Sequence, residues 1–508
     1  MKIMFIKPAL EIDATWDPIR TCSYLGIWYM ASLLKEHGHN VIYLDEAVRD
    51  GGLNIRSLFI RELKENGEIV ETPIEESYET FQAHKMSEFD SMTIEKIAEK
   101  YSSFLIGVTT RIIARVGQPE DKTLDKVKEF NPDIVGIPLI ASANYLPATR
   151  LAAKIRQELP KVKIIFGGQH VSANPEAFLE DNPAVNQVVT GDAISVIEDI
   201  VNGEITDKVV YGGFKEMDEF PFLNPEIIAK TNYPTIPNHT PPTNGRKWVD
   251  FMVTRGCFRK CSFCVAGCTP GCHVTTQTYS QLDKQLAMLK EAGYEELVIQ
   301  DDAFLWDKRH IRTHLPAVLT AIKKHGFKWQ SNGGIDFESL TDWAVDQIIE
   351  SGTCTALYVP FNPRIWNKYE SASHSMIGRY HDHLENLKRL RKAGIFVFTS
   401  AIIGTPEMDL IAFEDELATD KALVEEGYLD LALPLSATML PGTEWYRDNG
   451  ANIVRKDDWS GYSLFTTHHK TDHLSEKEIE TLMIRWYKEM KKVQKNPIWG
   501  CAFPSTSF

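Results

Sequence analysis

Short apolar runs alternate with amphipathic stretches along residues 1–200 of the chain. Apolar positions at helical spacing predict helices over 25–38 and 146–159, whereas uninterrupted apolar runs predict buried strands. Strands that alternate with helices in this way are typical of a parallel sheet covered on both faces. Residues 50–130 interrupt the pattern because they are charged and mostly helix-prone, which indicates an insertion. The runs that predict strands are 2–6, 41–44, 134–137, 164–166 and 188–189.

The same alternation returns over residues 246–445, after a proline-rich segment. Six prolines lie within 219–245, which predicts a linker or a strap across a surface. About five or six strand–helix units fit the later stretch, which predicts a full or partial barrel with its chemistry at the carboxyl ends of the strands. The strands expected there are 251–253, 297–299, 357–359 and 395–398. The predicted organisation is α/β: a Rossmann-like, doubly wound domain over 1–200, a linker over 201–245, the barrel over 246–445 and a helical C-terminal region over 446–508.

Composition and charge narrow the class of protein. The chain has 508 residues, of which 43% are hydrophobic and 25% are charged, as in ordinary globular domains. The formal net charge of −15 argues against nucleic acid or an anionic membrane as a partner. Residues 1–9 indicate a buried strand rather than a signal peptide, and no apolar run reaches the roughly 18 residues of a membrane-spanning helix. These features predict a soluble cytoplasmic protein.

Five of the eight cysteines lie within residues 257–272, and three of them follow the spacing Cys257-x3-Cys261-x2-Cys264. In a reducing compartment such a group binds metal more often than it forms disulfides. Three thiolates can hold three irons of a cubane iron–sulfur cluster, which leaves the fourth iron open to another ligand. Phe263 is placed to cover one face of a bound nucleobase. Spacing alone also allows a structural zinc site that includes Cys268, Cys272 or His273, and it leaves the role of Cys268 and Cys272 open.

In its context the cysteine motif resembles the signature of the radical S-adenosylmethionine (SAM) superfamily. An apolar strand leads into Arg255-Gly256-Cys257, and this context disfavours the zinc alternative. The resemblance implies a [4Fe-4S] cluster on the three cysteines and SAM bound at its open iron. It also implies a 5′-deoxyadenosyl radical, made with an electron from a flavodoxin- or ferredoxin-type donor. Further strings similar to family segments are Asp301-Asp302, Gly394 to Glu407, which includes Gly404, and Leu440 to Thr443.

The resemblance implies further residues of the barrel that contact a cofactor or the substrate. Asp301, Asp302 and Gly404 are expected to bind the cofactor. Asn332, before Gly333-Gly334, is placed to contact SAM, with a plain turn as the alternative. Asn362 stands where many relatives carry Glu at a site that faces SAM or substrate, so it is the candidate catalytic residue.

Four strings in the N-terminal part are Tyr24-Leu25-Gly26-Ile27, Asp133-Ile134-Val135-Gly136-Ile137, Gly167-Gly168-Gln169-His170 and Val188-Val189-Thr190-Gly191-Asp192. They resemble the cobalamin-binding domain that is often fused to radical SAM barrels. Glycines at strand ends let the backbone approach a flat macrocycle closely, and a doubly wound sheet binds ligands at the carboxyl edge of its strands. The alternative is a Rossmann-like domain that only covers the barrel. For His170, a contact to the corrin and a plain hydrogen bond within the loop both stay open. The candidate cofactor contacts are Leu25, Gly26, Ser142, Asn144, Gly167, Gly168, His170 and Gly191.

This N-terminal part departs from the family in two places. No histidine has an aspartate two residues before it, so the Asp-x-His-x-x-Gly motif that supplies a lower cobalt ligand is absent. Gly191-Asp192-Ala193-Ile194 stands where relatives carry Gly-Glu-Gly-Glu. A bound cobalamin would therefore take water or no lower ligand.

Together the resemblances imply a cobalamin-dependent radical SAM enzyme that methylates an unactivated carbon of a small molecule, with both cofactors facing one shared cavity. The alternative is a radical SAM enzyme that catalyses cyclisation, ring contraction, dehydration or epimerisation without methyl transfer. A non-catalytic sensor is disfavoured because the sequence has no basic patch or recognition-helix signature. His468, His469 and His473 are expected to form a solvated polar run, with metal binding as the alternative.

Overall fold

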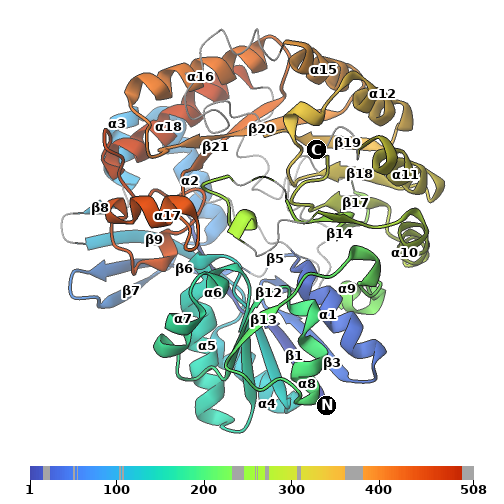
Figure 1. The fold of residues 1–508 in the computed structure, drawn as a ribbon. Helices are drawn as coiled ribbons and strands as arrows, with labels where there is room; N and C mark the ends of the chain where they lie inside the picture. Colours follow the sequence, from blue (N-terminus) through green and yellow to red (C-terminus); the bar gives the residue numbers. More distant parts are fainter. Residues whose placement is uncertain are drawn as a thin grey trace.

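The computed structural model describes residues 1–14, 23–49, 52–53, 55–101, 104–105, 108–230, 245–257, 259, 261–268, 274–305, 311–360 and 381–494. Two parallel sheets with their helices face each other, and an antiparallel sheet lies beside them (Figure 1). Among the described helices, none is both long enough and apolar enough to cross a membrane.

The first sheet has six parallel strands in the order β13-β12-β11-β10-β1-β3. Helices cover both faces, as the apolar runs predict: Ile3 and Phe5 of β1 pack on the side of α1 and α8, whereas Met4 and Ile6 pack on the side of α4 and α5. The strands are β1 (Lys2–Lys7), β3 (Asn40–Asp45), β10 (Ile134–Pro138), β11 (Lys163–Gly167), β12 (Gln187–Gly191) and β13 (Val209–Gly212). The helices are α1 (Leu25–Glu36), α4 (Glu120–Phe130), α5 (Tyr145–Glu158), α6 (Gln169–Ala173), α7 (Pro175–Asp181) and α8 (Ile197–Asn202).

The second sheet has six parallel strands in the order β14-β17-β18-β19-β20-β21. Among the described strands, β14 and β21 form its two edges, and helices line its outer side in Figure 1, so the sheet is a partial barrel. The strands are β14 (Trp248–Phe251), β17 (Glu296–Ile299), β18 (Lys328–Ser331), β19 (Cys354–Tyr358), β20 (Phe396–Ile403) and β21 (Leu431–Ser436). The helices are α10 (Tyr279–Glu291), α11 (Ile311–Lys324), α12 (Asp342–Ser351), α15 (His381–Lys392) and α16 (Leu410–Glu425).

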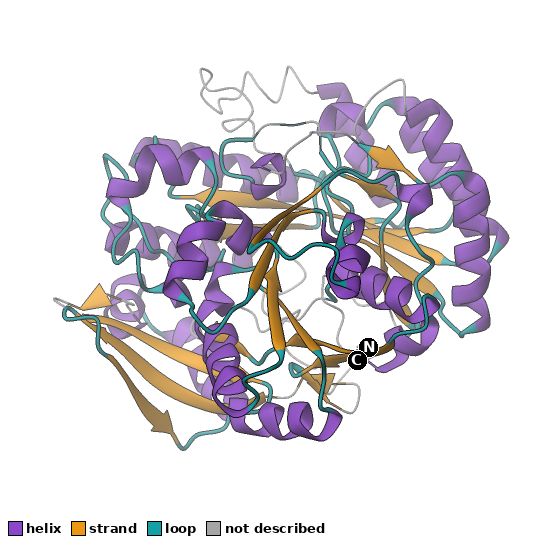
Figure 2. Cartoon of the chain, turned by 60° about the horizontal axis from the view of Figure 1, so that its bottom comes forward, coloured by secondary structure: helices purple, strands orange, loops and turns teal. Residues whose placement is uncertain are grey.

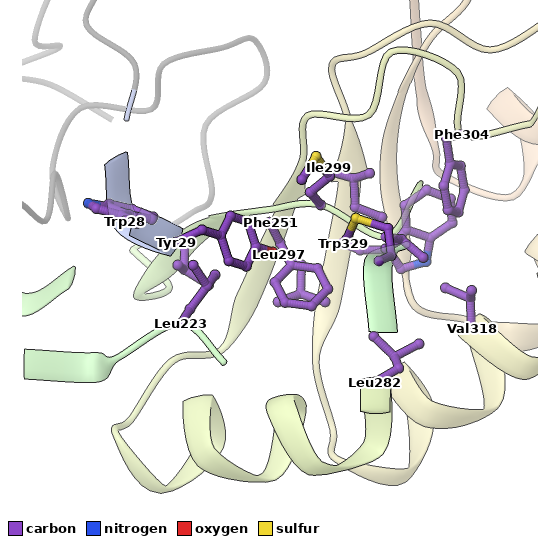
Figure 3. Packing of buried hydrophobic residues seen from close by; sticks show 14 of the residues in the cluster. Trp28, Tyr29, Leu223, Phe251, Leu282, Leu297, Ile299, Phe304, Val318 and Trp329 are labelled. Atoms are coloured by element: carbon purple, nitrogen blue, oxygen red, sulfur yellow. The ribbon is translucent and has the colours of Figure 1, made fainter. Parts of the chain in front are cut away.

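One apolar core joins the two sheets. Trp28 and Tyr29 of α1 belong to the same buried cluster as Phe251 and Trp329 of the barrel (Figure 3). Leu223, which precedes α9 (Pro225–Lys230), lies in this cluster, and its backbone N–H donates to the buried Gln285 side chain at 2.7 Å. Part of the segment predicted as a strap is therefore tied to both sheets, which holds their carboxyl edges in place.

The insertion combines an antiparallel sheet with helices, so the expectation of mostly helix missed its strands. β2 (Leu10–Asp13), β9 (Val108–Val116), β6 (Ile55–Lys64) and β7 (Ile69–Ile74) form an antiparallel sheet, visible at the left of Figure 2, and β8 (Phe104–Leu105) pairs with β9. Within the described part of the insertion, the helices are α2 (Tyr78–Ser91), α3 (Ile94–Tyr101) and the whole of α4. The strands were hidden because buried charged residues, such as Arg61 and Arg111, break the apolar alternation on which strand prediction depends.

The histidine run near the C-terminus is largely buried, which corrects the prediction of a solvated polar run. His468 and His469 are 1% and 0% exposed. The His469 Nε2–H donates to the Gly404 carbonyl at 2.6 Å, and the His468 ring lies 4.6 Å from the Tyr462 ring between centroids. The run lies between α17 (Glu444–Asn449) and α18 (Glu476–Val493) along the chain and anchors this segment to the end of β20.

Replacing Arg111 with methionine should destabilise the protein by about 3–5 kcal/mol, because it removes the guanidinium that neutralises two buried carboxylates. The Arg111 guanidinium contacts Asp458 at 3.0 Å and Asp13 at 3.4 Å, and all three side chains are buried. The midpoint of urea unfolding measures the effect. Arg447→Met is the control, since that side chain is 71% exposed, and it should change stability by less than about 0.5 kcal/mol. Equal effects of the two substitutions would contradict the buried pairing.

Stability should also fall in mild acid because of His469. Burial lowers the pKa of this imidazole from 6.5 to about 4, so between these pH values the unfolded chain binds a proton that the folded chain does not. The free energy of unfolding is therefore complete above pH 6.5 and declines as the pH drops towards 4, by on the order of 3 kcal/mol. Urea midpoints at pH 7 and pH 5 should differ less in His469→Gln than in the wild type. The exposed His473→Gln should keep the wild-type pH dependence.

Candidate active site

The three motif cysteines lie on one loop at the carboxyl edge of the barrel. The loop follows β14 and lies between the strands of a short pair, β15 (Thr254–Arg255) and β16 (Thr275–Thr276). Cys257, Cys261 and Cys264 are half-buried free thiols, and all three line one cavity of about 330 Å³, called here the cluster cavity. Burial raises the pKa of Cys257 to about 11 and also raises the pKa of Cys261, so loading a metal on these thiols must release protons.

The geometry of the cysteines suits a polynuclear cluster. In the described part of the chain, no three His, Cys, Asp or Glu side chains converge as ligands of a single ion. A cubane cluster engages each cysteine through a different iron. Three thiols on one cavity wall therefore fit the expected [4Fe-4S] cluster. Cys272 lies outside the described residues, and the Cys268 side chain is not described, so their role stays open.

The two aspartates after β17 have different surroundings: Asp301 bonds to the backbone, whereas Asp302 lines a cavity. Asp301 is fully buried, and its carboxylate accepts hydrogen bonds from the Val253 and Thr254 backbone N–H groups and from the Thr254 hydroxyl, each at 2.8 Å. It therefore braces the strand that leads into the cysteine loop, and its expected contact with a cofactor stays a prediction. Burial raises the pKa of Asp301 to about 7 against these hydrogen bonds. Asp302 lines the cluster cavity, where a contact with the cofactor is open to it.

The other barrel residues that were predicted to contact a cofactor or substrate lie in different surroundings. Phe263 lines the cluster cavity, with its ring centroid 5.4 Å from that of Trp445. Both amide atoms of Asn332 are buried without a hydrogen-bond partner among the described residues, and its contact with SAM stays a prediction. Gly404 packs against α18, where a Cβ atom would lie 2.8 Å from Ile479, and its contact with a cofactor stays a prediction. Asn362 lies outside the described residues.

Glycines at the ends of β11 and β12 border two cavities at the carboxyl edge of the first sheet. The deep cavity, of about 260 Å³, has mostly apolar walls, such as Phe5 and Ile27, and lies between the sheet and helices α1 and α8. The strand-end cavity, of about 560 Å³, adjoins it. Gly168 has φ +108°, and a Cβ atom there would lie 2.7 Å from the Leu139 carbonyl oxygen, so only glycine fits this bend.

The residues predicted to contact cobalamin all border cavities at this edge. A third cavity, of about 340 Å³ and called here the side cavity, adjoins the strand-end cavity. His170 lines this cavity, and its Nδ1 lies 2.8 Å from the Ser142 hydroxyl. The histidine therefore both makes a hydrogen bond within the loop and forms part of the cavity wall. Leu25, Gly26, Gly168 and Gly191 line the strand-end cavity, Gly167 the deep cavity, and Ser142, Asn144 and His170 the side cavity.

The strand-end cavity is shared by the two sheets. Gly26 and Gly191 come from the first sheet and its first helix, whereas Cys257 and Asp302 come from the barrel. Arg255, two residues before Cys257, contacts Asp192 after β12, with 3.1 Å between Nε and Oδ2. This ion pair crosses from one sheet to the other and fixes the cysteine loop beside the glycine loop.

Sequence reasoning missed several residues that line these cavities. Tyr24 lines all three cavities at the edge of the first sheet, and Gln169 does the same. Both lie within the four strings that resemble the cobalamin-binding domain, but nothing in the sequence indicated a ligand contact at either residue. Tyr462 and Leu464, from the C-terminal segment, line the side cavity, and no motif in the sequence marks them.

Comparison with known proteins agrees with this site. A family model described as a B12 binding domain matches residues 99–201. The chain is 25% identical over 405 residues to an uncharacterised methyltransferase of Pyrococcus horikoshii, and the match covers 73% of this chain and 82% of the relative. It is 22% identical to the bacteriochlorophyllide d C-8(2)-methyltransferase of Chlorobaculum tepidum, with 70% of this chain and 77% of the relative covered.

Two solved structures share the fold over almost the whole chain. The radical SAM methyltransferase TsrM from Kitasatospora setae, solved with cobalamin and a [4Fe-4S] cluster, matches with a TM-score of 0.51 and 11% identity, covering 94% of this chain and 84% of TsrM. The cobalamin-dependent radical SAM enzyme OxsB matches with a TM-score of 0.51 and 13% identity, covering 97% of this chain and 61% of OxsB. The chain therefore shares the fold of these two structures, and the B12 binding domain predicted for its N-terminal part agrees with the family model.

Each motif cysteine should be required for iron binding, whereas the barrel cysteine Cys354 should not. In the separate variants Cys257→Ala, Cys261→Ala and Cys264→Ala, iron should fall from about four atoms per chain to below about one, because two thiolates do not retain a cubane on an open loop. Cys354→Ala is the matched control, since Cys354 is a free thiol on β19 that does not line the cluster cavity. Iron analysis and the visible absorbance of anaerobically prepared protein measure the outcome. Iron loss in the Cys354 variant would contradict the assignment.

Proposed function

We propose that this chain is a cobalamin-dependent radical SAM methyltransferase that transfers a methyl group to an unactivated carbon of a small molecule. One observation carries the proposal: the strand-end cavity is lined both by the glycine loops of the B12-binding domain and by Cys257 of the cysteine loop. A radical methylation needs the methyl carrier and the radical source to face the same substrate. The methyltransferase names of the relatives support this choice over the non-methylating alternative.

The residues present fit both resident cofactors. Cys257, Cys261 and Cys264 would hold the cluster, and SAM would occupy the rest of the cluster cavity. The apolar deep cavity and the strand-end cavity would hold cobalamin, with Gly168 and its neighbours allowing close approach of the macrocycle. When bound, the cluster supplies the electron that cleaves SAM, and cobalamin supplies a methyl carrier.

The protein's own residues bind, orient and exclude water. Asp301 fixes the approach to the cysteine loop through its hydrogen bonds to Val253 and Thr254. The Arg255–Asp192 ion pair sets the distance between the two loops that carry the cofactor sites. Phe263 and Trp445 form an aromatic wall on the cluster cavity, which keeps water from the place where a radical would form. An external flavodoxin- or ferredoxin-type protein would deliver electrons.

Metal analysis is the first test. Protein made anaerobically in a host supplied with cobalamin should contain about four irons and about one cobalt per chain. In reactions with substrate, S-adenosylhomocysteine should accumulate together with 5′-deoxyadenosine. Four irons with 5′-deoxyadenosine but without substrate-dependent S-adenosylhomocysteine would instead establish the non-methylating alternative.

Cobalt should be lost selectively when the strand-end cavity is filled. Gly26 lies in the first turn of α1 and borders this cavity, and a Cβ atom added there would meet no other atom within 4 Å, so Gly26→Phe fills space without disturbing the fold. The variant should lose most of its cobalt, by about tenfold, and keep its iron. Glu36→Phe, at the exposed far end of the same helix, is the control and should keep both metals. Equal cobalt content in Gly26→Phe and wild type would contradict the placement of cobalamin.

A further inference from the structure

We propose that the side cavity binds the methyl acceptor, and that this acceptor is an uncharged, mostly apolar small molecule with one amide, carbonyl or hydroxyl group. The proposal rests on the proposed function. It deepens that function, since it assigns the substrate a place and a chemical class. Three features carry it: the position of the cavity between the two cofactor cavities, the pairing of the charged groups on its wall, and two unpartnered amides.

The side cavity lies between the spaces assigned to the two cofactors. It shares Tyr24 and Gln169 with the strand-end cavity, and it shares Leu440 and Leu464 with the cluster cavity. With cobalamin in the deep and strand-end cavities and SAM in the cluster cavity, the side cavity is the adjoining space that borders both. A substrate seated there lies within reach of both the adenosyl radical and the methyl carrier.

The charges on the wall are already neutralised. The Lys7 ammonium contacts Asp45 at 3.1 Å, and both side chains are 1% exposed. Asp13 is paired with Arg111 at 3.4 Å. A charged substrate would give up its hydration without meeting a free counter-charge on these residues, which disfavours both anions and cations.

Glu11 is the strongest case of this pairing. Its buried carboxylate lies 2.7 Å from the Arg115 guanidinium and also contacts Arg61 and Arg150. Although burial opposes ionisation, the three guanidinium groups hold the pKa of Glu11 at about 2, so the carboxylate stays ionised and satisfied. It is therefore not available to attract a cationic substrate. His170 adds no charge at neutral pH because burial lowers its pKa to about 4.

The rest of the wall of the side cavity is mostly apolar and includes two side-chain amides. Leu10, Leu440 and Phe465 provide apolar surface, and the Tyr462 hydroxyl is occupied by a bond to the Lys456 carbonyl at 3.0 Å. Among the described residues, the side-chain amides of Asn144 and Gln169 have no hydrogen-bond partner. Each amide carries donors and an acceptor, so these groups match a neutral amide, carbonyl or hydroxyl on the substrate.

Binding of three probes that share one ring system and differ in charge tests the class. Indole-3-acetamide is neutral, whereas indole-3-acetate is an anion and tryptamine is a cation at neutral pH. Isothermal titration of the anaerobic holoenzyme should show the neutral probe binding at least about tenfold more tightly than either charged probe. Equal or tighter binding of a charged probe would overturn the proposal, as would the absence of binding by all three at millimolar concentration.

Variants test the place of binding. Asn144→Ala should weaken binding of indole-3-acetamide about fivefold, as expected for the loss of one neutral hydrogen bond. Leu464→Trp, at a side chain that is 46% exposed and so tolerates enlargement, should fill the cavity and abolish binding. Because Leu464 also lines the cluster cavity, the iron and cobalt content of this variant is measured alongside. Asn202→Ala, at an exposed asparagine at the end of α8, is the matched control and should bind as the wild type does. Unchanged binding in both Asn144→Ala and Leu464→Trp would place the probe elsewhere and overturn the proposal.

The two proposals fail separately. If protein that contains no cobalt or iron after anaerobic preparation still binds the neutral probe selectively, the proposed binding site stands and the proposed methyltransferase function is wrong. Full cofactor loading with S-adenosylhomocysteine formation, but with no preference among the probes, would keep the function and remove the proposed substrate class.

Discussion

The ion pair between Arg255 and Asp192 joins the two loops on which the whole site depends. Each loop follows a strand of a different parallel sheet, and chemistry in such sheets gathers at the carboxyl ends of the strands. Two such edges become one site only when the sheets face each other closely. The shared core of α1 and the barrel supplies that closeness, and the ion pair sets the alignment of the loops.

Buried charge is the second constraint. The inserted sheet and the C-terminal segment meet through Arg111, Asp13 and Asp458, which are all buried. Such a network contributes little net stability compared with an apolar contact, but it penalises any other alignment because a displaced partner leaves an unpaired charge. The strand β2 that pairs with the insertion and the C-terminal segment are therefore held where both can line the side cavity.

Much of the fold was predictable because its strands are buried on both faces. Apolar runs such as 134–137 stand out in the sequence when helices cover both sides of a sheet, and β10 begins and ends within one residue of the predicted limits. The insertion could not be predicted in the same way. Its strands place arginines on a buried face, where carboxylates from other elements neutralise them. These partners lie far away in the sequence, so no local pattern predicts the pairing.

The sequence by itself determined the chemistry of the site: the spacing of Cys257, Cys261 and Cys264, and the glycines at strand ends, are local patterns that the backbone imposes. Only the tertiary structure decided which polar residues line a cavity. Asp301 and Asp302 are neighbours, yet one braces the loop and the other lines a cavity, because successive side chains at a strand end point in opposite directions. The side cavity likewise exists only in three dimensions, since its walls come from segments that lie hundreds of residues apart and meet through packing.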